Sequence, residues 1–363
     1  MPLVATAVCT IPLALPCESQ RVVPQFVSAH EELAGAAQVP APLVDPAVPS
    51  DAPIADEVRF DSGGTLPLVL PRDERLEFAV ILELGALGDI HAGDVELAAN
   101  VERYVAGLPA AGSQPAPAKD AVMGRVRSTA TGGYAGYTLH HELISRVLPQ
   151  TWPRVFYTDT QSGSEHRRRE LKIGVRDDES RAWYRADGHC KGCNNPEHFI
   201  ESKWLWGKPF HCEKCKRPEH RVWRDLQTRT VPSDAVDMLS AVYLTRALMR
   251  EKRESAQFHL IDRQKLWVVQ LKRGNTSRIA TPAGAFLAQE VVLSTKFPAG
   301  EPRDAGFEGL FGIRGSLRVW VDAESGVPIL IRGEFPVPVL GALDVRVELT
   351  SYRGTPDAFR KVK

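Results

Sequence analysis

The sequence lacks a net charge and a long hydrophobic run. Its 363 residues carry 45 Lys and Arg against 45 Asp and Glu, so no global field favours nucleic acid or an anionic membrane surface. Beyond the N-terminal segment, no stretch is long and apolar enough to cross a bilayer as a helix. We therefore expect a chain without a transmembrane span.

Catalytic signatures are missing too. There is no P-loop, no dinucleotide-binding fingerprint and no G-x-S-x-G nucleophile elbow. Residues 141–144 (H-E-L-I) begin like a zinc-protease motif, but Ser145 stands where the second histidine is required. Carboxylates in alternating strands mostly form the solvated face, and we interpret the basic run 166–169 as a solvated strand end. We predict that the protein is not an enzyme.

Helical periodicity is scarce, and 28 glycines and 27 prolines separate short apolar or alternating runs. Close turns without room for crossover helices predict antiparallel pairing. The fold class is therefore mainly β, a curved antiparallel sheet or partly open β-barrel with one main helix. The expected strands span 75–84, 93–99, 121–130, 137–148, 155–160, 167–175, 181–186, 258–261, 266–271, 286–295, 317–321, 327–335 and 343–352.

The one clear helix follows residue 232. Ser233 is its expected N-cap, with Asp234 and Asp237 in the first turn. We expect this helix to plug or cover the curved sheet through an apolar stripe at helical spacing. The stripe consists of Val236, Leu239, Val242, Tyr243 and Ala247.

Cysteine is rare outside one short stretch. Four of the six cysteines lie within 189–220, and the other two are Cys9 and Cys17. The phrase H-C-x-x-C-x-x-P-E-H occurs twice, at 189–198 and at 211–220. Two C-x2-C pairs separated by eighteen residues match the spacing of a zinc ribbon, in which each tight turn supplies half of a tetrahedral site.

The spacing predicts a structural Zn²⁺ site in a zinc-ribbon-like insert, because so short a module needs a metal or disulfides to fold. Three alternatives stay open: two disulfides in an oxidising compartment, a redox-active C-x-x-C without the usual βαβ context, and two sites of two cysteines and two histidines each. The predicted ligands are Cys190, Cys193, Cys212 and Cys215. Alternative ligands or neighbours of the ligands are His189, His198, His211 and His220.

The chain divides into regions of different composition. Residues 1–65 are predicted to be a leader and a Pro/Ala-rich disordered linker. The apolar start resembles the core of a signal peptide but has no preceding Lys or Arg, so it is either truncated or part of the disordered segment. A β domain is expected at 66–188 and 221–354, with a tail at 355–363. The insert, 189–220, is expected at the tip of a hairpin with arms 181–185 and 221–224.

Several phrases of the expected β domain resemble the DUF3108 family of exported bacterial proteins. They lie at 70–78, 90–97, 237–246, 317–322 with 327–328, 339–341 and 348–352. The resemblance covers about 66–353 without the insert. It implies a β-rich protein of the periplasm or cell envelope, without established chemistry or catalytic residues to carry over. The cysteine module departs from the family pattern.

Two functions are consistent with these observations. The first is a non-catalytic cell-envelope protein with a structural zinc site that binds an apolar ligand or a protein partner. The second is a nucleic-acid or protein docking module, because residues 189–224 hold eight Lys and Arg against four Glu, interleaved with Trp204, Trp206 and Trp223. Zinc-bound thiolates offset that charge and export removes most nucleic acid, so we expect nucleic acid not to be the partner.

Overall fold

The computed structural model describes residues 57–60, 66–85, 88–103, 122–134, 137–148, 155–164, 166–187, 222–298, 314–337 and 341–354. Contacts between Cα atoms divide the chain into two units, Met1–Pro53 and Ile54–Lys363. All of the described residues belong to the second unit. The expected leader, most of the linker, the insert and the tail lie outside the described residues.

Strands dominate the described residues, which contain a single helix. Two strands pair with each other, and fifteen form one sheet. In chain order the strands are β1 (Glu57–Phe60), β2 (Leu68–Pro71), β3 (Asp73–Glu83), β4 (Asp89–Arg103), β5 (Val122–Tyr134), β6 (Tyr137–Val147), β7 (Val155–Gly163), β8 (Arg167–Arg176), β9 (Glu179–Ala186), β10 (Gln227–Thr230), β11 (Ala235–Val236), β12 (Ser255–Asp262), β13 (Lys265–Thr281), β14 (Gly284–Lys296), β15 (Arg314–Asp322), β16 (Pro328–Val337) and β17 (Gly341–Gly354).

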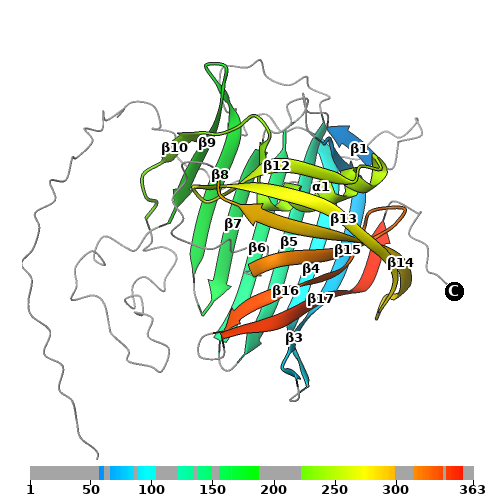
Figure 1. Cartoon of the computed structure of the whole chain (residues 1–363). Coiled ribbons are helices and arrows are strands. Elements are labelled where there is room, and N and C mark those ends of the chain that lie inside the picture. Colours follow the sequence, from blue (N-terminus) through cyan, green and yellow to red (C-terminus); the bar gives the residue numbers. More distant parts are fainter. Residues whose placement is uncertain are drawn as a thin grey trace, which may run out of the picture. The chain divides into compact units, whose positions relative to one another are not determined.

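The large sheet has the order β10-β9-β8-β7-β6-β5-β4-β3-β17-β16-β15-β14-β13-β12-β11. All neighbours are antiparallel except β11 and β12. Figure 1 shows the sheet curving, so that the cyan-to-green strands β4–β9 face the yellow-to-red strands β12–β17. Alternating burial follows from this curvature: in β7, for example, residues 155, 159 and 161 are buried, whereas residue 160 is exposed. The expected mainly β fold with a curved sheet is confirmed.

One chain segment joins the two ends of the sheet. Strand β10 pairs with β9 at one end, and β11, which follows after four residues, pairs with β12 at the other. We call residues 227–236, with the flanking strands β9 and β12, the seam. A small apolar cluster packs across it, so side chains as well as the connecting segment close the sheet. The cluster consists of Leu171, Ile173, Ala182, Val231, Ala235, Ile261 and Leu266.

The helix α1 (Met238–Arg250) lies on the inner side of the sheet (Figure 1). Its expected N-cap is wrong: Asp237 caps the helix, accepting hydrogen bonds from the amides of Leu239 and Ser240. Residues 233–234 form a turn instead, because Ala235 and Val236 are taken up as β11.

The expected apolar stripe packs into the core through Leu239, Tyr243 and Ala247, but the buried surface is wider than this stripe, because α1 is buried on nearly all sides. Ten of its thirteen residues are buried, including Thr245 and Arg246, whereas Val242 is only partly buried. A helix enclosed in this way packs inside a protein and does not lie on its surface. The expectation that the helix plugs the curved sheet is therefore confirmed.

The turn between β15 and β16 packs against this helix. Gly326 has a φ of +72°, and a Cβ atom there would lie 2.9 Å from the Cα atom of Arg246. Only glycine fits both the backbone conformation and the close approach. The turn over 322–326 is closed by a hydrogen bond from the amide of Gly326 to the carbonyl of Asp322.

Each of the thirteen expected strands corresponds to an observed strand, and β13 is longer than expected. The sequence analysis missed β1, β2, β10 and β11, which have two to four residues each. β1 lies inside 1–65, which was assigned to the linker, and pairs with β2. The hairpin that flanks the insert is present, but its second arm is β10 and not 221–224.

Candidate functional site

The predicted metal ligands cannot be placed, because they lie outside the described residues. These are Cys190, Cys193, Cys212 and Cys215, together with His189, His198, His211 and His220. Within the part of the chain that the structure describes, no three or more His, Cys, Asp and Glu side chains are grouped as in a metal site. The zinc site therefore stays a prediction.

The residues that flank this segment form a well-connected pair, which we call the neck: Asp187 and Trp223. They face each other in an antiparallel bridge. Asp187 Oδ1 accepts a 2.7 Å hydrogen bond from the amide of Arg168 on β8. The guanidinium groups of Arg168 and Arg185 lie over the indole ring of Trp223, 4.7 and 4.4 Å from its centroid. Such cation–π contacts hold the ring against the outer face of β8 and β9.

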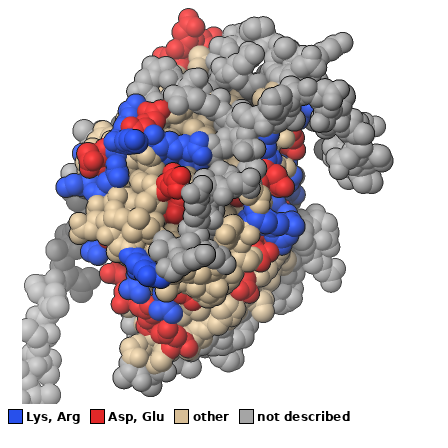
Figure 2. Space-filling view, turned by 90° about the vertical axis from the view of Figure 1, so that its right-hand side faces the viewer, with Lys and Arg blue, Asp and Glu red and all other residues tan. Residues whose placement is uncertain are grey.

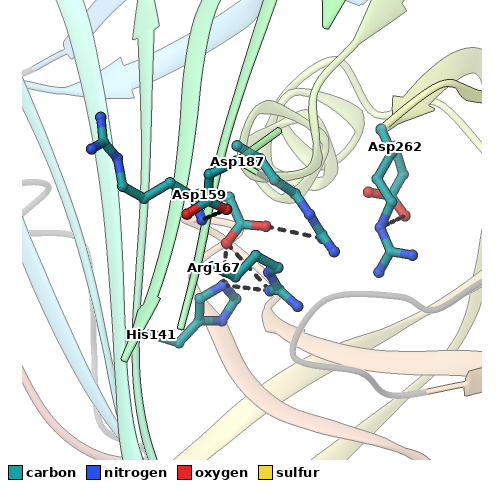
Figure 3. Close-up of polar contacts among 8 residues, drawn as sticks. His141, Asp159, Arg167, Asp187 and Asp262 are labelled. Carbon is teal, nitrogen blue, oxygen red and sulfur yellow. Dashed lines mark hydrogen bonds and ion pairs between the residues drawn. The ribbon is translucent and has the colours of Figure 1, made fainter. Parts of the chain in front are cut away.

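The inner face carries a charged cluster near the seam, centred on Asp159 of β7 (Figure 3). Its carboxylate is 7% exposed. Oδ1 lies 2.8 Å from His141 Nε2 and 3.3 Å from Arg167 Nη2, and Oδ2 lies 3.3 Å from Arg169 Nη1. Arg167 Nη2 also lies 3.2 Å from His141 Nε2. Both carboxylate oxygens thus have a cationic partner.

These contacts change the proton affinity of Asp159. Burial alone would raise its pKa, but the hydrogen bond from His141 and the charges of Arg167 and Arg169 outweigh burial and lower the pKa to about 2. The carboxylate is therefore ionised at neutral pH. Burial lowers the pKa of Arg169, and the charge of Arg167 adds to this effect.

The register of β6, β7 and β8 brings the cluster together. Asp159 lies opposite Arg169 on β8, and His141 lies opposite Gln161 on β7. The interpretation of 166–169 as a solvated strand end is wrong for two of its residues, because Arg167 and Arg169 are only 27% and 17% exposed. Their position relative to Leu171 and Ile173 on the same strand carried the missing signal, since every second residue faces the same side.

Two further polar groups lie inside the sheet around α1. Arg246 donates a 2.7 Å hydrogen bond to Glu74 Oε2 on β3, and Tyr243 donates a 3.1 Å bond to Glu74 Oε1. The Glu74 and Arg246 side chains are 2% and 1% exposed. Because both are charged types, the ion pair offsets a large desolvation cost.

The second group surrounds the helix cap. Asp237 Oδ2 accepts hydrogen bonds from the hydroxyls of Ser145 and Ser240, and Oδ1 accepts from the amides of Leu239 and Ser240. All of these donors are uncharged. Burial raises the pKa of Asp237, although the hydrogen bonds from Ser240, Ser145 and Leu239 oppose the shift.

The outer surface carries charges of both signs. On the face shown in Figure 2, Lys and Arg side chains alternate with Asp and Glu, and uncharged residues lie between them. The described part of this face has no broad area of one sign, in keeping with the equal numbers of acidic and basic residues. No helix in the described residues is long and apolar enough to span a membrane.

Comparisons with known proteins end at the level of the fold. No model of a known protein family and no curated protein matches the chain, so the resemblance to the DUF3108 family stays a prediction.

The solved structures that match the chain include the following two. A beta-barrel-like protein of the domain of unknown function DUF1849 from Brucella abortus has 9% identity, covers 78% of this chain and 98% of its own, and has a TM-score of 0.44. A putative exported protein with a YmcC-like fold from Bacteroides fragilis has 10% identity, 78% and 97% coverage, and a TM-score of 0.28. At these scores the likeness carries no argument about function.

Proposed function

We propose that this protein is a non-catalytic scaffold of the cell envelope, and that its residues 189–220 form a cysteine module that folds around zinc and binds a protein partner. The neck is the observation that carries the proposal. It holds the two ends of the cysteine segment on adjacent strand positions, where Cα atoms are about 4.5–5.5 Å apart. The proposed location in the cell envelope rests on the family resemblance alone.

The neck lowers the cost of building a metal site. Residues 188–221 must return to their starting point, so part of the loop-closure entropy is already lost when the sheet folds. Four thiolates in two C-x2-C turns then complete a tetrahedral site within a closed loop. Metal binding supplies the folding free energy that so short a module lacks.

The interior of the sheet favours a protein partner over an apolar ligand. The inner face is packed against α1, and the buried apolar residues of both form one cluster. Leu239, Leu244 and Leu248 of the helix are at most 2% exposed. An apolar ligand on the inner face would have to displace this helix, whereas a protein partner bound at the neck would not.

The first experiment measures zinc and thiols on the full chain, purified without added metal or reductant. Apart from Cys9 and Cys17, we expect about one zinc per chain and four thiols that react only after chelation, as for a closed four-thiolate site. Two zinc ions would assign the histidines as ligands. No metal together with no reaction of these four cysteines before or after chelation would mean disulfides and would overturn the zinc assignment.

Substitution of one ligand tests whether the scaffold and the module are separate. We expect Cys190→Ser to lose zinc while the far-ultraviolet circular dichroism of the β sheet is kept, because in this proposal the module and the sheet are joined only at the neck. A global loss of β signal in this variant would overturn the division into scaffold and module.

Site-specific photo-crosslinking in cells that produce the full chain tests docking. A crosslinker at Val222, which is 43% exposed beside the neck, is compared with one at Leu287, which is 51% exposed on β14. We expect a defined protein adduct at 222 that disappears in Cys190→Ser, and none at 287. Equal adducts at both positions, or none at 222, would contradict the docking role.

A further inference from the structure

The outer face of β5–β9 carries a row of cationic and aromatic side chains, which we call the outer row. Strand register places its members directly opposite one another on five neighbouring strands. In strand order they are Arg125, Arg146, Phe156, Lys172 and Trp183. Residues directly opposite each other face the same side of a sheet. Because neighbouring strands lie about 4.8 Å apart, the row is about 19 Å long.

The members of the outer row point away from the interior. Their chain neighbours Val147, Val155 and Ile173 belong to the buried inner face and are at most 2% exposed, and side chains alternate between the two faces of a strand. All five members are partly exposed. The Nζ atom of Lys172 lies 5.7 Å from the centroid of the Phe156 ring, so a cation and an aromatic ring adjoin within the row.

Two arginines of the row face each other without a carboxylate between them. Like charges directly opposite in a sheet are destabilising, and neither Arg125 nor Arg146 forms an ion pair within the described residues. The Nε atom of Arg125 is buried without a hydrogen-bond partner. Burial lowers the pKa of Arg146, and the charge of Arg125 adds to this effect. Glu102 and Glu142 act in the opposite direction but do not cancel the shift.

Nearby acids do not neutralise the row. Glu142 and Glu170 share the outer face, but each already accepts a hydrogen bond from an arginine outside the row. Arg127 Nε donates to Glu142 at 2.8 Å, and Arg185 Nε donates to Glu170 at 2.6 Å. Glu102 is the further acid that acts on the row. The three cations of the row therefore exceed the carboxylate charge that remains to balance them.

A second pair of facing arginines shows that the same fold can compensate such a pair. Arg332 of β16 lies opposite Arg346 of β17. Glu83 of β3 lies between them, 3.7 Å from Arg332 and 2.7 Å from Arg346. Asp89 adds a second acid 2.9 Å from Arg346. Facing arginines without a carboxylate are thus not a general consequence of this fold, and such a local conflict is a reason to look for an anionic ligand.

We propose that the outer row binds a linear polysaccharide that carries carboxylates on its sugar rings. The cations would hold the carboxylates through charge-assisted hydrogen bonds. The rings of Phe156 and Trp183 would pack against the apolar faces of the sugars, a contact that suits large aromatic side chains at a wet surface. The strand spacing of about 4.8 Å is close to the length of one pyranose ring in an extended chain. A row one residue wide fits a single chain better than the plane of a membrane.

Nucleic acid shares part of this chemistry but fits the outer face less well. Single strands also stack their bases on aromatic side chains and place their phosphates on cations. Their dense charge is usually matched by a strongly basic domain, whereas this chain has a pI of about 7.2. The acids Glu142 and Glu170 on the same face would repel closely spaced phosphates. A glycan with one carboxylate per sugar carries less charge and gains more from the aromatic rings.

Titration calorimetry of the full chain tests the class of ligand. We expect a hexamer of galacturonate or of mannuronate to bind. Cellohexaose, which is uncharged, and hexaglutamate, which has no sugar rings, should bind at least tenfold more weakly. The dimer of the same uronate should also lose at least tenfold, because it covers only part of the row. Tighter binding of a six-nucleotide oligothymidylate would overturn the proposal in favour of nucleic acid, as would equal binding of hexaglutamate in favour of a general anion patch.

Variants of the row test the location of the site. Arg146→Gln and Trp183→Leu should each weaken binding of the hexamer at least fivefold. Arg146→Gln relieves the repulsion with Arg125, so it should unfold at the same temperature as the wild type or a higher one. The matched control is Arg332→Gln, which removes a 49% exposed arginine on β16 and should leave affinity unchanged. No binding of either hexamer at millimolar concentration, or full affinity in both row variants, would refute the site.

Discussion

Asp159 at the seam and Asp237 at the cap of α1 are both buried carboxylates, yet their pKa values shift in opposite directions. Asp159 is 5% exposed and has its pKa lowered to about 2, whereas Asp237 is fully buried and has its pKa raised. Each makes several hydrogen bonds. The difference lies in the charge of the donors: a histidine and two arginines surround Asp159, whereas hydroxyls and amides surround Asp237.

The comparison shows that the four hydrogen bonds from neutral donors do not offset the desolvation of the Asp237 carboxylate. Burial favours the neutral acid, and at Asp159 the hydrogen bond from His141 together with the charges of two arginines reverses this preference. The ion pair of Glu74 and Arg246 places such a charge deep among apolar residues of the helix region. The seam and the helix region thus both contain buried carboxylates, but these carboxylates differ in whether a positive charge lies beside them.

The largest expected effect comes from removing the compensating charge in the helix region. Glu74→Gln should lower the free energy of unfolding by about 3–5 kcal/mol, because Arg246 stays buried without its carboxylate. Urea denaturation measures this change. The double variant Glu74→Gln/Arg246→Met should recover most of the loss, and Glu77→Gln, in an exposed ion pair with Arg75, should cost less than about 1 kcal/mol. Equal losses for Glu74→Gln and Glu77→Gln would contradict the argument.

Asp159→Asn should have the next largest effect, about 2–3 kcal/mol in the same measurement, because the partly buried Arg167 and Arg169 then face each other without the negative charge. Arg127→Gln, which breaks a more exposed pair with Glu142 on β6, serves as the control and should cost less than about 1 kcal/mol. A loss for Asp159→Asn no larger than that of the control would show that the cluster does not stabilise the fold.

Acid titration sharpens the same comparison. The pKa of Asp159 is 3.8 in the unfolded chain and about 2 in the folded protein. The folded state therefore binds its proton less readily, and the stability from this group is complete above about pH 4 and lost as the pH falls to about 2. The loss should be about 2 kcal/mol. Wild type and Asp159→Asn should converge in stability over this range, and parallel curves would disprove the assigned shift.

The smallest effect is expected for Asp237→Asn, within about 1 kcal/mol of the wild type. Asparagine is as good an N-cap as aspartate, and its amide donates to the hydroxyls that now donate to Oδ2. Because the pKa of Asp237 is raised, the wild type loses stability from this group as the pH rises through that pKa, and the variant does not. Thermal unfolding at pH 3 and pH 8 measures the difference. A cost above 3 kcal/mol at both pH values would mean that the charge itself is required.

Much of the strand pattern was predictable because each long strand buries one face. The residues of β17, for example, alternate between buried Val345, Val347 and Leu349 and less buried neighbours. Strands β10 and β11 were not predictable, since four and two residues contain no period that can be recognised. The N-cap was misplaced for a related reason: Ser233 and Asp237 both carry capping side chains, and only the pairing of β11 with β12 decides between them.

The sequence by itself determined the mainly antiparallel β fold, the one helix, and the predicted zinc spacing of the cysteine segment, because these depend on residues close together in the chain. Only the tertiary structure decided that α1 is enclosed, that the segment 227–236 joins the two ends of the sheet, and that His141, Asp159, Arg167 and Arg169 meet. Such contacts depend on strand register and on closure of the curved sheet. Both are set by packing between residues far apart in the sequence, for which no local pattern exists.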